Sequence, residues 1–288
     1  MIVGSAGMLG EGFSHIIPNL TNDYIRTHYK KRSNYNSIKL DIRDKNHVTE
    51  LLKKTNSDVV INCSSITNPE ECEKDPDNAY ATNVTGTQNL AEVCNANNIH
   101  FVQVSTEYVF DGKKGPYKIT DDAIPLTIYG KTKLESEKIT VKINPNFCIA
   151  RTAMLFGWCK NKINFATFLI SNLRARKKTK VINDQFVSPS YNDNVAEMLN
   201  ELAEKKISGI WHIAGSSICT RYDFAINLAE IFNLDISLIE EISISQMPWT
   251  VQRPIHCGLV VDKTLTLSHK PMTIEQSIKR MKNEEKLL

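Results

Sequence analysis

Long apolar runs and paired cysteine motifs are missing from this sequence of 288 residues. No stretch approaches the roughly 18 uninterrupted apolar residues of a membrane-spanning helix. The first ten residues, MIVGSAGMLG, do not resemble a signal peptide because they have no basic start. The seven cysteines are scattered without a C-x-x-C pair, which favours free thiols over a disulfide framework or a zinc site. We therefore expect a cytoplasmic protein that does not insert into a membrane.

An excess of charge of one sign is also lacking. The chain has 35 Lys and Arg against 32 Asp and Glu, and its formal net charge of +3 is too small for a general nucleic-acid binder. The seven histidines include no H-x-x-x-H pair, so a catalytic metal is not expected. With 41% hydrophobic and 23% charged residues, the composition is that of a globular protein rather than a disordered one.

Short apolar runs alternate with longer helical patterns in the first half of the chain. Continuous apolar runs are typical of strands buried on both faces, as in a parallel sheet covered by helices. The expected strands are 1–3, 58–62, 100–104, 147–152 and, more weakly, 210–213. The expected helices are 8–17, 45–54, 78–96 and 129–143. This alternation predicts an α/β fold built on a Rossmann-type doubly wound parallel sheet.

The alternation loosens after about residue 153. Helical patterns dominate the second half, near 163–178, 192–204, 221–232 and 273–283. Thr273 and Gln276 are spaced as a capping box at the start of the last of these helices. We predict a Rossmann domain over 1–153 and a smaller substrate-binding region over 154–288, with some segments of the latter returning to the Rossmann domain.

Three glycines, Gly4, Gly7 and Gly10, lie between the first predicted strand and the first predicted helix. Glycines at this spacing allow a tight turn, a close approach of a pyrophosphate to the backbone, and close packing of the helix on the sheet. The free N–H groups and the positive dipole end of the helix then face the phosphates. A flexible N-terminal turn is the alternative, and the strand–helix context favours a dinucleotide cofactor.

The residues after the second expected strand, near 24–29, indicate which dinucleotide is bound. An NAD-binding chain usually carries an acidic residue there, which binds the ribose 2′-hydroxyl. Here Tyr29 is followed by the cations Lys30, Lys31 and Arg32. Because these cations attract a 2′-phosphate, we predict NADPH, with NADH and a solvated charge run as the alternatives. Asp41, after the third expected strand, is placed to accept a hydrogen bond from the adenine amino group.

A Y-x-x-x-K motif carries the candidate catalytic residues, Tyr129 and Lys133. Residues four apart share one face of a helix, so the ammonium of Lys133 is expected to lower the pKa of the Tyr129 phenol. A phenol tuned in this way can donate a proton to a carbonyl oxygen as a hydride reaches the carbon. Tyr35 and Lys39 match the same motif, but they lie in a polar loop, where we interpret the match as chance. Thr106 follows a predicted strand, where its hydroxyl either binds the substrate oxygen or caps a turn.

Longer segments make the chain resemble the extended short-chain dehydrogenases/reductases, and among them the dTDP-4-dehydrorhamnose reductases. The resemblance runs through GSAGMLG, DVVINCSSIT, AYATNVTGTQNLA, VSTEYVFDGKKGPY, PLTIYGKTK, ARTAMLFG, DQFVSPSY, GIWHIAG and RPIHCGL. It implies catalytic roles for Thr106, Tyr129 and Lys133. The cofactor contacts that we predict with it are Gly4, Gly7, Met8, Leu9, Gly10, Lys30, Lys31, Arg32, Asp41, Ile42, Ser65, Ile66, Thr67, Tyr129 and Lys133. The predicted substrate contacts are Thr106, Glu107, Tyr108, Met154, Asn164 and Arg253.

The chain departs from the pattern of this family at three places. Glu107 replaces the usual Asp, Met154 replaces a Trp that lines the sugar pocket, and Cys63-Ser64-Ser65 replaces a run of alanines. The implied activity is the NADPH-dependent reduction of the C4 ketone of a nucleotide-linked 4-keto-6-deoxy sugar, in deoxysugar and polysaccharide biosynthesis. The departure at Met154 leaves the identity of the sugar open.

Other functions and partners remain open from the sequence. A sugar-nucleotide epimerase or dehydratase is one alternative, and a non-catalytic NADP-binding subunit, as in the beta subunit of methionine adenosyltransferase, is another. A homodimer is a further expectation. A basic cluster is either a diphosphate-binding site or a solvated helix end: Arg174, Arg176, Lys177, Lys178 and Lys180.

Overall fold

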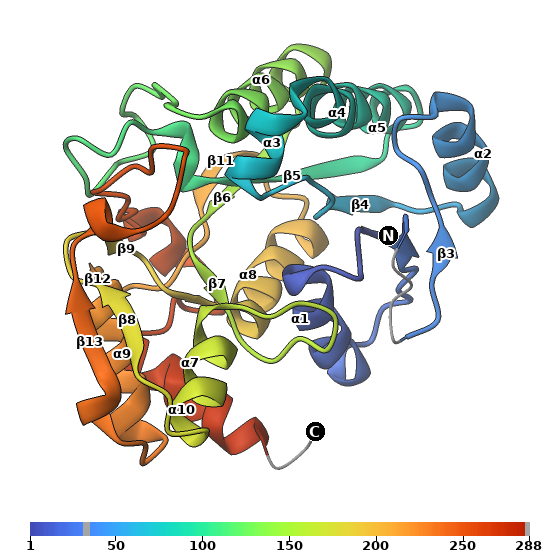
Figure 1. The fold of residues 1–288 in the computed structure, drawn as a ribbon. Coiled ribbons are helices and arrows are strands. Elements are labelled where there is room, and N and C mark those ends of the chain that lie inside the picture. The colour runs from blue at the N-terminus through green and yellow to red at the C-terminus, as the bar shows by residue number, and fades with distance from the viewer. Residues whose placement is uncertain (31–34, 286–288) are drawn as a thin grey trace.

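A five-stranded parallel sheet forms the centre of the computed structural model, which describes residues 1–30 and 35–285 (Figure 1). Its strands run in the order β1, β4, β5, β6, β11: Ile2–Val3, Val59–Asn62, His100–Thr106, Cys148–Thr152 and Gly209–His212. Every neighbouring pair is parallel. The predicted α/β class and parallel sheet are thus confirmed.

Two further short strands continue the sheet beyond β1. β2 (Thr27–His28) pairs in parallel with β3 (Ile38–Lys39) and reaches β1 through a parallel bridge between Ile2 and Arg26. The Ser5 N–H also donates to the Thr27 carbonyl at 2.8 Å. The winding therefore reverses beside β1, and the carboxyl ends of β1 and β4 open onto the crevice where such sheets bind ligands.

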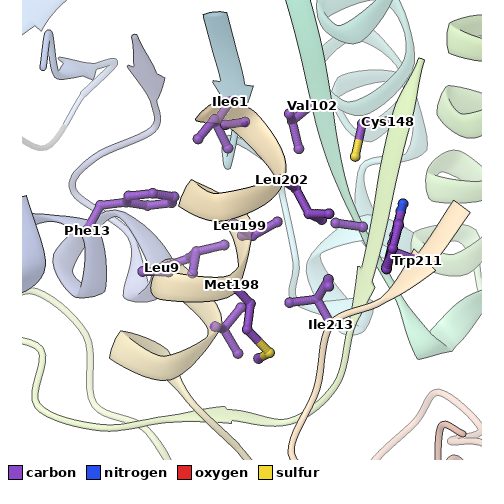
Figure 2. Close-up of a cluster of buried hydrophobic side chains, with 14 of the residues drawn as sticks. Leu9, Phe13, Ile61, Val102, Cys148, Met198, Leu199, Leu202, Trp211 and Ile213 are labelled. Atoms are coloured by element: carbon purple, nitrogen blue, oxygen red, sulfur yellow. The ribbon is translucent and has the colours of Figure 1, made fainter. Parts of the chain in front are cut away.

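Helices cover both faces of the sheet (Figure 1). α5 (Gly86–Ala96) and α6 (Ile128–Ile143) lie on one face, where α2 (Lys45–Thr55) packs against α5. α1 (Met8–Ile16) and α8 (Asn192–Glu204) pack together on the other. Figure 2 shows the core under this second pair, where Leu9, Phe13 and Leu199 meet Ile61 and Val102 of the sheet. Although α8 and β11 follow residue 153, both belong to this sheet and its core.

The remaining C-terminal segments form a second core beside the sheet. Its helices are α7, α9 and α10: Phe165–Arg174, Arg221–Ile231 and Ile274–Glu284. Its short strands are β7 to β10, β12 and β13: Leu155–Phe156, Thr179–Ile182, Phe186–Val187, Ser190–Tyr191, Cys219–Thr220 and Ile239–Ile242. Phe156, Leu169, Phe224 and Ile278 are fully buried in it. Thr273 and Gln276 form the predicted capping box of α10.

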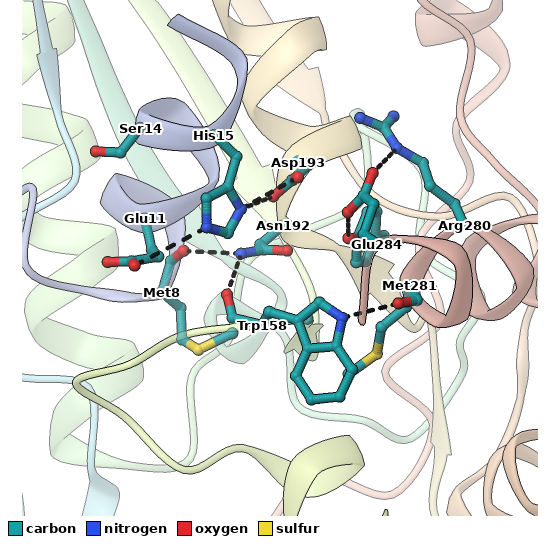
Figure 3. A network of polar contacts seen from close by, with 12 residues as sticks. Met8, Glu11, Ser14, His15, Trp158, Asn192, Asp193, Arg280, Met281 and Glu284 are labelled. Carbon is teal, nitrogen blue, oxygen red and sulfur yellow. Dashed lines mark hydrogen bonds and ion pairs between the residues drawn. The ribbon is translucent and has the colours of Figure 1, made fainter. Parts of the chain in front are cut away.

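A polar network ties α1 to the C-terminal region (Figure 3). The His15 ring lies 3.0 Å from a carboxylate oxygen of Asp193 on α8. The Asn192 amide donates to the carbonyls of Met8 and Trp158, both at 3.3 Å, and the Trp158 indole donates to the Met281 carbonyl of α10 at 2.7 Å. The start of α1 is therefore fixed by residues far along the chain.

Two predicted helices differ from those observed. The helix expected over 78–96 is divided into α4 (Pro76–Tyr80), a π-helical segment Ala81–Thr85, and α5. The helix expected over 163–178 ends at Arg174, because Arg176 adopts a left-handed conformation with φ 54° and the chain enters β8. α3 (Pro69–Lys74) was not predicted. No helix in the described part of the chain is long and apolar enough to cross a membrane.

Candidate active site

The three glycines of the β1–α1 turn have different structural reasons to be glycine. A Cβ on Gly4, which has φ +82°, would lie 2.8 Å from the Ser64 nitrogen, and one on Gly10 would lie 2.3 Å from the Ser5 Cα. A Cβ on Gly7 would meet only the Gly4 carbonyl, at an ordinary 3.5 Å. Packing within the protein therefore requires Gly4 and Gly10, whereas Gly7 borders open space that a ligand can enter.

The N-terminus of α1 is available to an anion. Gly7 is its N-cap and supplies no side-chain hydrogen bond, so the first N–H groups, from Met8 to Gly10, have no helical acceptor. Gly7, Met8 and Leu9 line a cavity of about 380 Å³. The open side of Gly7 and the free donors of α1 fit a dinucleotide pyrophosphate.

A smaller hollow beside the turn has the position of an adenosine site. Tyr29, Asp41, Ile42 and Arg43 line it. Asp41 is held by Arg43, with 2.7 Å between Oδ2 and Nη2, and this contact lowers the pKa of the Asp41 carboxyl. The Arg43 guanidinium lies 4.9 Å from the centre of the Tyr29 ring. Arg43 is thus a cation beside the site that the sequence reasoning missed.

The cations predicted to select NADPH are described only in part. Lys30 is exposed, with Nζ 5.6 Å from the centre of the Tyr29 ring, and it lines a hollow of about 320 Å³ together with Gly7 and Arg43. Lys31 and Arg32 lie outside the described residues. Among the described residues, Lys30 and Arg43 are the cations that line this hollow.

Ser65, Ile66 and Thr67 form a loop after β4, and Asn83 holds it. The side-chain oxygen Oδ1 of Asn83 accepts from the Ile66 N–H at 2.8 Å and from the Ser65 hydroxyl at 2.9 Å. Its amide donates to the Ile66 carbonyl and to Thr132 on α6. Asn83 lies in the π-helical segment, a feature that often accompanies functional sites. It is a positioning residue that the helical pattern alone did not reveal.

Thr106, Tyr129 and Lys133 meet in the 380 Å³ cavity. Thr106 ends β5, and the two other residues come from the first turns of α6, whose N-cap is Thr127. All three are buried, with exposed fractions of 4%, 9% and 3%. The Lys133 ammonium donates to the Val104 carbonyl at 2.7 Å, which fixes it beside the end of β5. Tyr35 is not among the residues that line this cavity.

Burial controls the ionisation of this trio. It raises the pKa of Tyr129 above its ordinary value. Burial also lowers the pKa of Lys133 to about 8. The net pKa of Tyr129 is therefore raised rather than lowered as the sequence suggested, because burial outweighs any attraction from the lysine and keeps the phenol protonated.

Four of the predicted substrate contacts join Thr106 around the cavity: Glu107, Tyr108, Met154 and Asn164. The Glu107 carboxylate accepts from the Thr106 hydroxyl at 2.7 Å, and burial raises its pKa. Asn164 caps α7, and its amide donates to the Gly157 carbonyl at 2.8 Å. Arg253 is not among the lining residues, because its guanidinium pairs with Glu70 and stacks 4.9 Å from the centre of the Trp249 ring.

The basic cluster after α7 is a solvated helix end rather than part of the cavity. Arg174 pairs with Glu285, Arg176 with Asp235, and Lys178 with Glu240, all with exposed cationic side chains. Arg221, which the sequence reasoning did not single out, lines the cavity instead. Across residues 1–30 and 35–285, no group of three or more His, Cys, Asp or Glu side chains is arranged to hold a metal ion, and all seven cysteines are free.

The chain is similar to sugar-nucleotide reductases. Residues 1–287 match the family described as RmlD substrate binding domain. A dTDP-4-dehydrorhamnose reductase of Aggregatibacter actinomycetemcomitans is 31% identical over 276 residues, covering 91% of this chain and 90% of that protein. The probable low-salt glycan biosynthesis reductase Agl14 of Haloferax volcanii is 30% identical over 259 residues, covering 88% and 86%.

Solved structures share the fold over nearly the whole chain. The crystal structure of a dTDP-4-dehydrorhamnose reductase from Clostridium acetobutylicum superposes with a TM-score of 0.85 at 28% identity, covering 99% of this chain and 98% of that one. A dTDP-glucose 4,6-dehydratase from Bacillus anthracis has a TM-score of 0.83 at 18% identity, covering 99% and 96%, and shares the fold alone. The predicted resemblance is confirmed by these matches.

Proposed function

The chain belongs to the RmlD substrate binding domain family. We propose that it is an NADPH-dependent reductase of nucleotide-linked 4-keto-6-deoxy sugars, acting in deoxysugar and polysaccharide biosynthesis. The observation that carries the proposal is that Thr106, Tyr129 and Lys133 line the same cavity as the α1 N-terminus. One cavity can thus hold the pyrophosphate of a dinucleotide and present a proton donor to the substrate. The reductases to which the chain is similar support this substrate class.

Bound NADPH supplies a hydride to C4 of the sugar. Tyr129 donates its phenolic proton to the ketone oxygen, so the ketone becomes an alcohol. Because burial raises the pKa of Tyr129, the phenol carries this proton at neutral pH. Lys133 would hold the nicotinamide ribose, and its positive charge favours the phenolate that the transfer leaves behind. Thr106 would orient the ketone when its hydroxyl is released by Glu107, and the loop 65–67 would border the nicotinamide.

The choice of NADPH rests on charge around the adenosine side. Lys30 and Arg43 border this part of the site, and cations there attract a 2′-phosphate. We also propose that the enzyme works in the cytoplasm, which its seven free thiols support. A homodimer remains a prediction.

A non-catalytic role is the second candidate, and one specific similarity favours it. The methionine adenosyltransferase 2 subunit beta of Pongo abelii is 30% identical over 235 residues, covering 79% of this chain and 70% of that protein. The complete set of Thr106, Tyr129 and Lys133 in one cavity favours the enzyme.

An NADPH-oxidation assay distinguishes the two functions. The purified protein is mixed with NADPH and each of a panel of 4-keto-6-deoxy sugars linked to dTDP, UDP or GDP. We expect NADPH consumption with at least one sugar and the matching alcohol as product. No consumption with any sugar, together with stoichiometric co-purification with a synthetase, would overturn the proposal in favour of a regulatory subunit.

A further inference from the structure

Arg221 is a cation that lines the cavity but takes no part in the proposed proton transfer. It is the first residue of α9, directly after β12, and it lines the cavity together with Glu107, Tyr108 and Phe165. Its side chain is partly buried, and this burial lowers its pKa. Because an arginine remains charged even so, the fold holds a positive charge at the cavity wall.

Two hydrogen bonds and a ring contact fix the direction of the Arg221 side chain. Its Nε donates to the side-chain oxygen Oε1 of Gln185 at 2.6 Å, and the Gln185 side-chain amide donates to the Pro254 carbonyl at 2.9 Å. The guanidinium lies 5.4 Å from the centre of the Phe165 ring. Its terminal nitrogens have no hydrogen-bond partner among residues 1–30 and 35–285. The planar end of the group is thus held in place with its donors unused.

The charges around Arg221 favour the binding of an anion. The nearby Arg253 opposes the charge on Arg221, whereas Glu107 favours it. Arg253 is paired with Glu70, but Arg221 forms no ion pair with a carboxylate in the described part of the chain. Two guanidinium groups therefore lie near each other, and only one of them is paired with a carboxylate. This excess positive charge favours binding of a further negative group.

We infer that Arg221 binds the diphosphate of the nucleotide-sugar substrate, an inference that rests on the proposed reductase function. A guanidinium fork matches two phosphate oxygens, and Arg221 is the cavity-lining arginine of the described chain. At the other end of the cavity the Thr106 hydroxyl already donates to the Glu107 carboxylate, so Thr106 offers no free donor to a phosphate while Glu107 is ionised. The diphosphate therefore lies at Arg221 and the sugar at the catalytic trio, which sets the direction in which the substrate enters.

Binding measurements on the NADP⁺-bound protein test this assignment. Calorimetry compares dTDP, UDP and GDP with the corresponding nucleosides, for the unmodified protein, Arg221→Gln, Arg221→Lys and the control Arg176→Gln. We expect Arg221→Gln to lower the affinity for the preferred nucleoside diphosphate about 10- to 100-fold and to leave the affinity for the corresponding nucleoside almost unchanged. Arg221→Lys, which keeps the charge and loses the fork, should lie between. Arg176→Gln should change neither, because Arg176 pairs with Asp235 outside the cavity.

The affinity for NADPH separates this role from a structural one. Its own pyrophosphate lies at α1, so every variant should bind NADPH as the unmodified protein does, which also shows that the variants fold. Diphosphate affinity that does not change in Arg221→Gln, in a protein that reduces a keto sugar, would overturn the assignment and leave the proposed function intact. Diphosphate binding that depends on Arg221, without reduction of any keto sugar, would support the assignment and overturn the reductase.

Discussion

The Thr106 hydroxyl donates a hydrogen bond to the Glu107 carboxylate, with 2.7 Å between Oγ1 and Oε2. Thr106 has a single proton to donate, and its oxygen also accepts from the Tyr108 N–H at 3.2 Å. While Glu107 is ionised, that proton is held by the carboxylate and is not offered to a ketone. The protonation state of Glu107 therefore decides whether Thr106 can polarise the substrate.

This contact predicts a specific pH dependence. Burial raises the pKa of Glu107 above its ordinary 4.5. As the pH falls through that raised value, Glu107 gains a proton, donates to Thr106 and frees the Thr106 hydroxyl for the ketone. We expect kcat/KM to rise over this range, and Glu107→Gln, whose amide always has a proton to donate, to remove the rise. Identical pH profiles for Glu107→Gln and the unmodified enzyme would contradict this role. Glu240→Gln removes a carboxylate from an exposed ion pair with Lys178 and serves as the control, which should keep the pH profile of the unmodified enzyme.

Gly7 and Gly10 should respond differently to the same substitution. Gly7→Ala places a methyl group where a pyrophosphate approaches, without a clash inside the protein. We expect NADPH affinity to fall about tenfold or more with little change in Tm. Gly10→Ala forces a Cβ against the Ser5 backbone and should lower stability by about 1–3 kcal/mol. Thermal melts and NADPH titrations of both variants check the pair, and a loss of Tm in Gly7→Ala as large as in Gly10→Ala would refute the distinction.

The basic residues after β2 should set the cofactor preference. The unmodified protein is expected to bind NADPH more tightly than NADH. Replacing Lys30, Lys31 and Arg32 together by Ala should remove most of that difference, since the 2′-phosphate loses its cations. Lys53→Ala, an exposed change on α2, serves as the control. Equal affinities for the two cofactors in the unmodified protein would show that the assignment of NADPH is wrong.

Met154 should make the enzyme less selective among 4-keto sugars. It lines the cavity, and its N–H donates to the Glu107 carboxylate with 3.4 Å between N and Oε1. The resemblance to the reductases implies a Trp at this position. A thioether is flexible and offers no flat stacking surface, so we expect activity on dTDP-4-dehydrorhamnose with another 4-keto sugar preferred. Met154→Trp should shift the preference towards the rhamnose precursor. The ratio of kcat/KM values for the two sugars measures this, and a strong preference for the precursor in the unmodified enzyme would make Met154 a neutral replacement.

The sequence predicted the elements that depend on local patterns. The glycine turn, the buried strands and the capping box at Thr273 each follow from neighbouring residues, and the structure confirms them. Arg221 was missed because its direction depends on Gln185 and Pro254, which lie 36 and 33 residues away along the chain. Asn83 was missed because its role depends on a π-helical turn, which helical periodicity does not reveal.

The sequence also misjudged an electrostatic effect. Spacing alone suggested that Lys133 lowers the pKa of Tyr129. In the structure burial is the main cause of the pKa shifts of both residues, and the spacing of the two residues in the sequence does not show how deeply they are buried. Likewise, the ion pairs of Arg174, Arg176 and Lys178 join segments distant in sequence. These interactions become visible only when the second core has assembled.

The proton donor is the central claim, and Tyr129→Phe tests it most directly. This change removes one hydroxyl and keeps the ring, which packs 5.5 Å from the Tyr108 ring, so NADPH binding should survive. With the preferred 4-keto sugar, NADPH oxidation should be about 10²- to 10⁴-fold slower than in the unmodified enzyme. Tyr35→Phe, the other match to the motif, should be close to unchanged. Near-normal turnover in Tyr129→Phe would contradict the account, because the reduction would then draw its proton from another group.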